Sequence, residues 1–434
     1  MSLAGRVALA PYLRWRFEHW SEDRLLDHQQ RRLRLLLEEV AKRSPYYRSL
    51  IEPETRLADV PMMDKSTMMA EFDNINTAGL LRDELVSFRI RQEHEGSNDL
   101  YPGGCSIGLS SGTSGNKVLT VLSPRELDRY SALLLARNGL PRRLPNRKVL
   151  FALRTNNPAF TSITRLGVKL LYVDYLQSPA KLIDLINEHR LNVLAGPPSL
   201  LCMLAEHHTS IDTPIDAMLS YAEELDPETR EQLADTFGAP VAEIYQGAEG
   251  MIGSSCRDGR LHLNEDVTFV ELEDAGDNLG ATSRVIVTDL YRTTQPFIRY
   301  QLGDLLEVGG RDCTCGSAFR LIKRIHGRSD GMFLLADSQG GTVRLMPDYV
   351  RRSINRASAD IIEYQAIQRA TDRVEVRLDL AGSADRAAIE ETIRSNLTMW
   401  CGRADAEMPA LEFSDHPPER NERSGKLIRV SRSF

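Results

Sequence analysis

Long apolar runs are absent from this sequence of 434 residues, and none reaches the ~18–20 residues that a membrane-spanning helix needs. The first residues hold only a short apolar stretch, Val7 to Ala10, which is too short for the core of a secretory signal peptide. Cysteine is scarce, with 6 residues in the whole chain, and this number does not suit a disulfide scaffold. Together these features predict a soluble, cytoplasmic protein without a membrane span.

A basic excess is missing as well. Lys and Arg number 54 against 61 Asp and Glu, a formal net charge of −7, so we expect no nucleic-acid partner. The hydrophobic fraction of 42% and the charged fraction of 26% are those of a globular protein, which excludes wholesale disorder. Because single cores stop growing near ~250–300 residues, the length predicts two domains.

A long helix is predicted over residues 21–43. Ser21 is a suitable N-cap, and Ser44-Pro45 ends the segment. The apolar stripe expected to face the core consists of Leu26, Leu33, Leu37 and Val40.

Strand-like and helical segments alternate between residues 105 and 290. Buried strands are predicted at 149–153, 169–173, 193–195 and 241–244, and helices at 124–135, 181–188 and 199–207. Further strand-like runs follow at 284–290 and 297–308. The alternation indicates an α/β fold with a largely parallel sheet, whose ligands bind beyond the carboxyl ends of the strands.

The sequence changes in character after residue 331. Strands are predicted at 361–368, 373–380 and 411–413, with a helix at 386–397. We therefore predict a large N-terminal domain, residues 1–329, and a small α+β C-terminal domain, residues 331–434. Ser329-Asp330-Gly331 is the candidate hinge between them.

A loop rich in glycine and hydroxyl groups follows Ile107–Leu109. It reads Ser110, Ser111, Gly112, Thr113, Ser114, Gly115, Asn116 and Lys117. Backbone N–H groups and hydroxyls of such a loop can surround phosphate oxygens, although a surface turn has the same composition. The G-x-x-x-x-G-K-[ST] spacing is absent, which disfavours a P-loop kinase or ATPase.

Four later segments strengthen the phosphate interpretation. Tyr245-Gln246-Gly247-Ala248-Glu249 places an aromatic ring and a carboxylate at the end of a predicted strand. Asp304 follows Gly303 and suits a diol such as ribose, while His326 to Asp330 follow a strand-like run at the domain border. Lys426 follows Gly425 near the end of the chain.

In this order, the segments LSSGTSG, IYQGAEG, LHLNED, RTTQPFIRY and CTCGS resemble the adenylate-forming superfamily of acyl- and aryl-CoA synthetases, peptide-synthetase adenylation domains and luciferases. The phenylacetate-CoA ligases are more similar still, through Arg299-Tyr300-x-x-Gly303-Asp304-Leu305 and Cys313-x-Cys315-Gly316. Within that branch the chain resembles enzymes related to synthetases that adenylylate a deazaflavin cofactor. The same group includes ligases that activate hydroxybenzoate-type acids for pigment or aryl-polyene synthesis.

The resemblance implies a nucleotide site. Ser110 to Gly115 would orient the β- and γ-phosphates of ATP, Tyr245 would lie against the adenine, and Gln246 would also belong to the nucleotide site. Asp304 would take the ribose hydroxyls, with Arg328 beside it. The segment Ala222, Glu223 and Glu224 would line the adenine and acyl pocket.

It also implies the catalytic groups and the substrate side of the site. Glu249 would hold Mg²⁺, and Lys426 would close over the first half-reaction from a small mobile domain that swings on Asp330. The walls of the acid pocket are expected from 154–160 and 221–250. Asn156, Asn157 and Gly247 are the candidates there, although Asn156 and Asn157 could equally cap a loop.

A carboxylate that attacks the α-phosphate meets anionic repulsion, which Mg²⁺ and the Lys426 ammonium would offset. Little acid–base chemistry is needed, so positioning and charge stabilisation should dominate. The expected substrate is a small, aromatic carboxylic acid, and the expected acceptor is the thiol of CoA or of a carrier-protein phosphopantetheine.

Three cysteines and one histidine form a second candidate site. Cys256, His262, Cys313 and Cys315 offer the donor types and the number of ligands of a tetrahedral zinc site. Some phenylacetate-CoA ligase relatives carry such a zinc in this region. Because all four ligands would come from the protein, we expect a structural role, and reduced cysteines in a packed subdomain are the alternative.

Three departures from the family pattern keep other functions open. Asn116 stands where the phosphate loop continues with Lys, Ala248 replaces a Thr, and Gly331 follows the hinge where a second acid is common. The alternatives are amide formation, cofactor adenylylation, ATP-dependent nitrite activation for diazotisation of an aryl amine, or a non-catalytic nucleotide- or metal-binding protein. The oligomeric state is open, with a homodimer among the alternatives.

Overall fold

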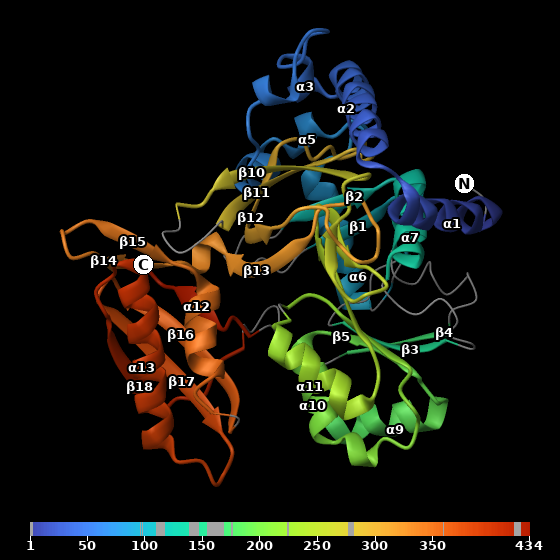
Figure 1. Ribbon diagram of the computed structural model, residues 1–434. Coiled ribbons are helices and arrows are strands. Elements are labelled where there is room, and N and C mark those ends of the chain that lie inside the picture. Colours follow the sequence, from blue (N-terminus) through green and yellow to red (C-terminus); the bar gives the residue numbers. More distant parts are fainter. Residues whose placement is uncertain are drawn as a thin grey trace. The chain divides into compact units, whose positions relative to one another are not determined.

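The structure is a computed structural model that describes residues 3–95, 97, 99–109, 118–138, 147–153, 169–174, 177–223, 225–276, 282–358, 360–420 and 427–434. It confirms an α/β fold with several sheets flanked by helices (Figure 1). The chain divides into two compact units. The first contains Met1–Glu271, Ile286–Gln301 and Gly309–Ile322, and the second contains Leu272–Val285, Leu302–Val308 and Lys323–Phe434. The role of Asp330 as a hinge stays a prediction.

The largest sheet lies in the first unit and has the strand order β4-β3-β5-β6-β7-β8-β9. Its strands are β3 (Lys148–Ala152), β4 (Lys169–Val173), β5 (Val193–Gly196), β6 (Ala217–Ser220), β7 (Val241–Gly247), β8 (Gly250–Ser255) and β9 (Leu261–Leu263). Pairing is parallel from β4 to β7 and antiparallel from β7 to β9. The predicted strands at 149–153, 169–173, 193–195 and 241–244 are therefore confirmed.

Alternation along the strands gives this sheet two apolar faces. Leu150 and Ala152 of β3 face one core, together with helices α9 (Pro179–His189), α10 (Pro198–Glu206) and α11 (Pro227–Phe237). Figure 1 shows these three helices gathered on one side of the sheet. Val149 and Phe151 face the other side, where they pack with Val193, Ala195 and Tyr221.

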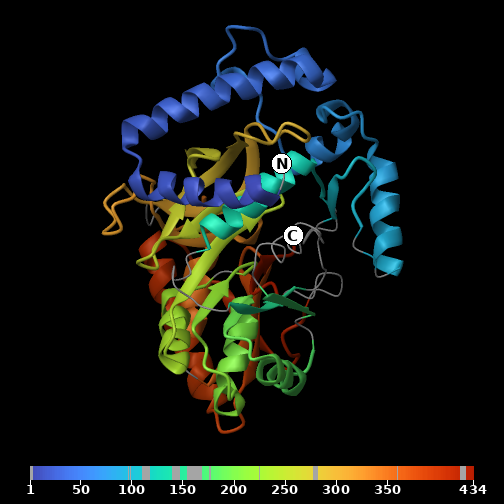
Figure 2. The same ribbon diagram turned by 90° about the vertical axis from the view of Figure 1, so that its right-hand side faces the viewer.

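The helices at the start of the chain are α1 (Leu3–His19), α2 (Glu22–Arg43) and α3 (Pro45–Arg48), followed by α4 (Lys65–Ala70), α5 (Phe72–Ile75) and α6 (Arg82–Glu95). The short strands β1 (Ser106–Leu109) and β2 (Leu119–Leu122) form an antiparallel pair, and α7 (Pro124–Ala136) follows them. Helix α1 packs beside α7, as Figure 2 shows, and Leu13 of α1 belongs to the apolar cluster between them. The structure finds no helix among its described residues that is long and apolar enough to cross a bilayer.

The apolar stripe predicted for α2 is wrong at its start. Leu26 is 40% exposed, whereas the preceding Leu25 is fully buried. The buried face also contains two polar residues, His28 and Gln29. Both bond to backbone carbonyls, His28 to that of Asp266 at 3.0 Å and Gln29 to that of Glu265 at 2.8 Å. Because their polar atoms find these partners, polar side chains occupy core positions that a purely apolar pattern cannot reveal.

The second unit contains a sheet with both parallel and antiparallel strand pairs. Its strands and helices include β14 (Phe333–Ala336), β15 (Thr342–Leu345), α12 (Pro347–Asn355), β16 (Ile361–Ala370), β17 (Arg373–Leu380), α13 (Arg386–Ala404), β18 (Ala410–Ser414) and β19 (Val430–Arg432). The sheet β18-β17-β16-β19 packs against α12 and α13, which lie side by side in Figure 1. A further sheet has the order β10-β11-β12-β13, from β10 (Thr268–Asp274), β11 (Thr282–Asp289), β12 (Tyr300–Val308) and β13 (Ile322–Arg328).

Candidate functional site

Several predicted site residues lie outside the described part of the chain. These are Ser110, Ser111, Gly112, Thr113, Ser114, Gly115, Glu224, Asn156, Asn157 and Lys426. Their roles stay predictions. The remaining candidates form one group in each unit and a cysteine–histidine cluster in the first.

The predicted Tyr245–Glu249 segment is the turn of a β-hairpin at the carboxyl end of β7. Gly247 pairs with Gly250, so Ala248 and Glu249 are the two turn residues. A Cβ on Gly247 would collide with the carboxylate of Glu249, so glycine is needed for this carboxylate to fold back over the strand end. Gln246 accepts a hydrogen bond from the hydroxyl of Tyr130 at 2.8 Å, while Tyr245 is half-buried.

A buried arginine supports the same hairpin. Arg292 donates to the Ala248 carbonyl at 2.7 Å and to the Val121 carbonyl at 3.1 Å. Burial lowers the pKa of Arg292, and the negative charges of Asp289, Glu126 and Glu249 oppose that shift. Three carboxylates therefore lie near this guanidinium, and Asp289 also acts on a second cation, Arg129.

The two neighbouring carboxylates are held by backbone amides. Glu126 accepts N–H groups from Thr293 at 2.7 Å and Thr294 at 2.8 Å. Asp289 accepts from the backbone of Tyr291 and Arg292, yet burial raises the pKa of Asp289 to about 6. Sequence reasoning missed Glu126 and Asp289 as site residues. Arg292 is the first residue of the RTTQPFIRY segment, but the sequence of that segment does not indicate that Arg292 is buried.

Ala222 and Glu223 lie after β6, at the same edge of the sheet. Ala222 adopts a left-handed backbone conformation with φ of 69°. The Glu223 carboxylate accepts from Ser199, at 3.2 Å from its amide and 3.0 Å from its hydroxyl, and so caps the start of α10. The adenine contact assigned to this segment stays a prediction.

The second unit brings three predicted residues together. Arg328 lies 3.3 Å from the Asp304 carboxylate and 3.4 Å from that of Asp330. Gly303 has a φ of 75°, and a Cβ there would lie 2.9 Å from the guanidinium of Arg328. Glycine at 303 therefore permits the close approach of Arg328 to Asp304.

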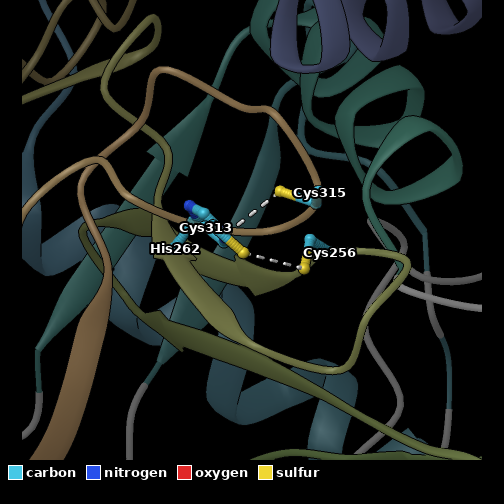
Figure 3. Close-up of side chains that lie close together, drawn as sticks. All are labelled: Cys256, His262, Cys313 and Cys315. Atoms are coloured by element: carbon cyan, nitrogen blue, oxygen red, sulfur yellow. Dashed lines mark hydrogen bonds between the residues drawn. The ribbon is translucent and has the colours of Figure 1, made fainter.

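The cysteine–histidine cluster is fully assembled in the first unit. Cys256 follows β8, His262 lies in β9, and Cys313 and Cys315 come from one loop; their ligand atoms all lie within 4.8 Å of one another (Figure 3). The sulfurs of Cys256 and Cys313 are 3.9 Å apart, and the Cys315 sulfur lies 3.6 Å from His262 Nε2. In a tetrahedral site with Zn–S bonds of ~2.3 Å, two sulfurs lie roughly 3.8 Å apart. These separations fit such a site and exclude a disulfide, whose S–S bond is ~2.05 Å.

Surrounding groups orient the four candidate ligands. His262 Nδ1 lies 2.8 Å from the Phe319 carbonyl, which fixes its proton there and turns the free Nε2 toward the sulfurs. Burial lowers the pKa of His262 and raises the pKa of Cys315 to about 12. A neutral imidazole is a competent ligand, and a buried thiolate needs a cation beside it.

Aromatic side chains enclose the cluster. Phe17 and Trp20 from α1 and its end pack with Phe319 around the three sulfurs. Phe17 meets the ring of His262 edge-on, with centroids 5.4 Å apart. The candidate metal centre therefore joins α1 to the hairpin β8–β9 and the 309–321 loop.

A buried ionic network lies next to these aromatic rings. Asp266 forms two bonds to Arg137, at 2.5 and 2.7 Å, and lies 2.9 Å from Arg16. A guanidinium nitrogen of Arg16 lies 2.7 Å from His28 Nε2, and burial lowers the pKa of His28 to about 4. The LHLNED motif thus supplies buried ion-pair partners in this structure.

An apolar cavity of about 80 Å³ lies on the face of the large sheet that carries Phe151. It is lined by Leu134, Leu135, Asn138, Arg147, Val149, Phe151, Leu170, Val193, Ala195, Leu219, Tyr221, Ile244 and Gln246. Three of these residues, Tyr221, Ile244 and Gln246, fall in the wall predicted over 221–250. The wall predicted over 154–160 lies outside the described residues.

Comparison with known proteins relates the chain to CoA ligases. No family model matches. Phenylacetate-coenzyme A ligase of Thermus thermophilus is 23% identical over 93% of this chain and 95% of its own length. Protein CapK of Staphylococcus aureus is 28% identical over 44% of this chain and 41% of its own length.

Solved structures share the fold. A 2-hydroxyisobutyryl-CoA ligase in the postadenylation state superposes with a TM-score of 0.73, at 17% identity, over 96% of this chain and 91% of its own. An anthranilate CoA ligase in complex with anthranoyl-AMP superposes with a TM-score of 0.51, at 16% identity, over 75% of this chain and 66% of its own. These likenesses establish the architecture.

Proposed function

We propose that the chain is a member of the adenylate-forming superfamily, in its phenylacetate-CoA ligase-like branch, and that it activates a small, aromatic carboxylic acid with ATP and transfers the acyl group to coenzyme A. The observation that carries this proposal is the hairpin turn of Gly247–Glu249 at the carboxyl edge of the large sheet. Gln246 of the same hairpin lines the apolar cavity, and three carboxylates, Glu126, Asp289 and Glu249, lie near Arg292, which donates to the Ala248 carbonyl of the turn. Ligands of parallel sheets bind at this edge.

In the first half-reaction, a carboxylate oxygen of the acid bonds to the α-phosphorus of ATP and pyrophosphate leaves. Glu249 would hold Mg²⁺, which supplies charge neutralisation between the acid and the nucleotide phosphates. Glu126, Asp289 and Glu249 place three carboxylates near Arg292, and carboxylate oxygens are ligands suited to Mg²⁺. Lys426 is proposed to stabilise the charge that develops on the α-phosphate.

In the second half-reaction, the thiol sulfur bonds to the acyl carbon and AMP leaves. We assign Asp304 and Arg328 to the ribose, which fits the 3.3 Å contact that holds the Asp304 carboxylate in place. Asp330, two residues after Arg328, is the proposed hinge. Rotation of the C-terminal domain about it would remove Lys426 from the site before the thiol enters.

The Cys256, His262, Cys313 and Cys315 cluster is proposed to hold a structural Zn²⁺. All four positions of a tetrahedral ion would be filled by protein donors, so no position remains for a substrate. A carrier-protein pantetheine as acceptor and a homodimer stay predictions from the sequence.

ATP–pyrophosphate exchange over a panel of benzoates, phenylacetates, cinnamates and fatty acids tests the proposed chemistry. We expect exchange with one class of small acid, and a CoA thioester when coenzyme A is added. Glu249→Gln should abolish most of the exchange, whereas Glu206→Gln, at an exposed position on α10, should not. Exchange with no acid, but AMP release with nitrite and an aryl amine, would contradict acid activation.

A further inference from the structure

Two buried side chains of one segment in the first unit bind two different strands. The segment, residues 292–295, follows β11 and has Arg292 and Gln295 at its ends. The Gln295 amide accepts a hydrogen bond from the backbone N–H of Val121 at 2.8 Å and donates one to the Leu119 carbonyl at 3.0 Å. A neighbouring strand would form the same kind of bonds, so Gln295 takes the place of such a strand along one edge of β2.

Arg292 joins this edge of β2 to the hairpin of β7 and β8. One guanidinium nitrogen donates to the Ala248 carbonyl at 2.7 Å, and another donates to the Val121 carbonyl at 3.1 Å. The second nitrogen also donates to Gln295 Oε1 at 3.1 Å. Because a guanidinium holds its donors in a rigid planar fork, these bonds fix the position of the Ala248 carbonyl relative to β2.

The anchored carbonyl controls the next residue of the turn. The Ala248 carbonyl and the Glu249 N–H belong to one planar peptide group, so a bond to the carbonyl fixes the orientation of that group. Glu249 carries the carboxylate proposed to hold Mg²⁺, and β2 is the first described strand after the predicted phosphate loop, residues 110–115. Arg292 and Gln295 therefore connect the strand that follows the predicted phosphate loop with the turn that presents the proposed metal ligand.

The acceptors of Arg292 point to a geometric role. In the described part of the chain, every hydrogen bond of Arg292 goes to a neutral oxygen, those of Ala248, Val121 and Gln295. Apolar residues could hold the same strands together without the cost of burying a charge. A buried guanidinium bound to two carbonyls sets the distance between them, and alignment of this kind is what a site that brings a metal ion to phosphates requires.

We propose that Arg292 and Gln295 are positioning residues for adenylate formation: they hold the turn of Glu249 in register with β2, so that the metal ion and the nucleotide phosphates meet in one geometry. Their action is indirect and passes through Glu249. The inference rests on the proposed function, because it depends on the Mg²⁺ role of that carboxylate.

A substitution that keeps the charge tests the geometry. Arg292→Lys replaces the planar fork by a single ammonium and should lower kcat for pyrophosphate exchange by about 10- to 100-fold, because a displacement of ~1 Å can cost ~10²-fold in rate. The Mg²⁺ concentration that gives half of the maximal rate should rise as well. Since the charge at 292 is unchanged, this rise reports the position of Glu249. Arg125→Lys, at an exposed position on α7, is the matched control and should leave both values as in wild type.

A neutral variant provides a second test in case Arg292→Lys fails to fold. Gln295→Ala removes both bonds to β2 without a change of charge, and it should also lower kcat and raise the Mg²⁺ requirement. Gln232→Ala, at an exposed position on α11, is its control. Thermal melts identify the variants that are folded. Wild-type kcat and an unchanged Mg²⁺ requirement in folded Arg292→Lys or folded Gln295→Ala would overturn the inference while the proposed function stands.

Combination with Glu249→Gln separates positioning from a general structural role. If Arg292 acts through Glu249, then Arg292→Lys should reduce exchange much less in the Glu249→Gln background than in wild type, because the carboxylate that it positions is already lost. Equal fold reductions in the two backgrounds would assign Arg292 to general stability and would also overturn the inference.

Manganese binding decides the case in which wild type shows no exchange with any acid, a result that would refute the proposed function by itself. Mn²⁺ replaces Mg²⁺ as the probe, and binding of Mn²⁺ with ATP is followed by electron paramagnetic resonance. Weaker binding by Arg292→Lys than by wild type would still support the positioning role. Equal binding by the two proteins, or no binding by wild type, would overturn it.

Discussion

Replacing Cys315 by serine should release the metal from the cysteine–histidine cluster and destabilise the first unit. A serine hydroxyl is a poor zinc ligand, and Cys256, His262 and Cys313 would then offer only three donors at separations suited to four. The aromatic rings of Phe17 and Phe319 pack around the cluster, so loss of the ion also loosens the contact of α1 with the 309–321 loop.

The size of the effect follows from linkage. At a free zinc concentration of ~1,000 times Kd, binding to the folded state alone stabilises it by about 4 kcal/mol. In a domain of about 250 residues, a change of 1 kcal/mol in the free energy of unfolding moves Tm by ~2 °C. For the larger first unit we therefore expect a fall in Tm of roughly 8 °C.

Three measurements check this prediction. Elemental analysis of the wild type should give one zinc per chain, and Cys315→Ser should have lost it. Calorimetry should show the lower Tm, and cobalt substitution should produce thiolate-to-metal absorption only in the wild type. Cys105→Ser, which alters a partly exposed cysteine outside the cluster, should keep both zinc and Tm. If the wild type contains no metal as purified, and its Tm equals that of Cys315→Ser, the metal centre is refuted.

Glu249→Gln should reduce the rate of pyrophosphate exchange by about 10²–10³-fold, the loss typical for one electrostatic group in an active site, and an unchanged rate would remove Glu249 from the mechanism. Asp266→Asn should cost about 3–5 kcal/mol of unfolding free energy in urea, because Arg16 and Arg137 would stay buried without their partner; the exposed Asp235→Asn serves as its control. The folded-state pKa of His28, about 4, lies below its unfolded value near ~6.5, so the unfolded chain binds the proton first as the pH falls. Stability should therefore be complete above pH ~6.5 and decline by about 3 kcal/mol toward pH ~4, and His28→Gln should flatten this decline in pH-dependent thermal melts.

Much of the fold follows from local sequence patterns. Strands β3 to β7 are short apolar runs bounded by polar residues, and the predicted helix at 124–135 lies within α7. Helix α1 was not predicted, because Pro11 interrupts its pattern and its apolar residues bind surfaces supplied from far along the chain. The stripe of α2 failed for a similar reason: His28 and Gln29 bond carbonyls about 240 residues away, at 3.0 and 2.8 Å.

Some residues of the candidate site could likewise be predicted from the sequence, and others depend on the tertiary structure. Donor chemistry and the family resemblance selected Cys256, His262, Cys313 and Cys315, and the structure brings these four residues together. Glu126 reads as the third residue of a capping box with Ser123, and its bonds to Thr293 and Thr294 need the tertiary structure.

Oxygen transfer from the acid to AMP tests the central claim most directly. The acid that supports pyrophosphate exchange is labelled with ¹⁸O in its carboxylate and incubated with ATP, Mg²⁺ and coenzyme A, and the products are analysed by mass spectrometry. Attack of the carboxylate on the α-phosphorus leaves one labelled oxygen in AMP after the thioester has formed, which is the predicted result. Unlabelled AMP, or label in inorganic phosphate with ADP as the second product, would contradict an acyl-adenylate intermediate.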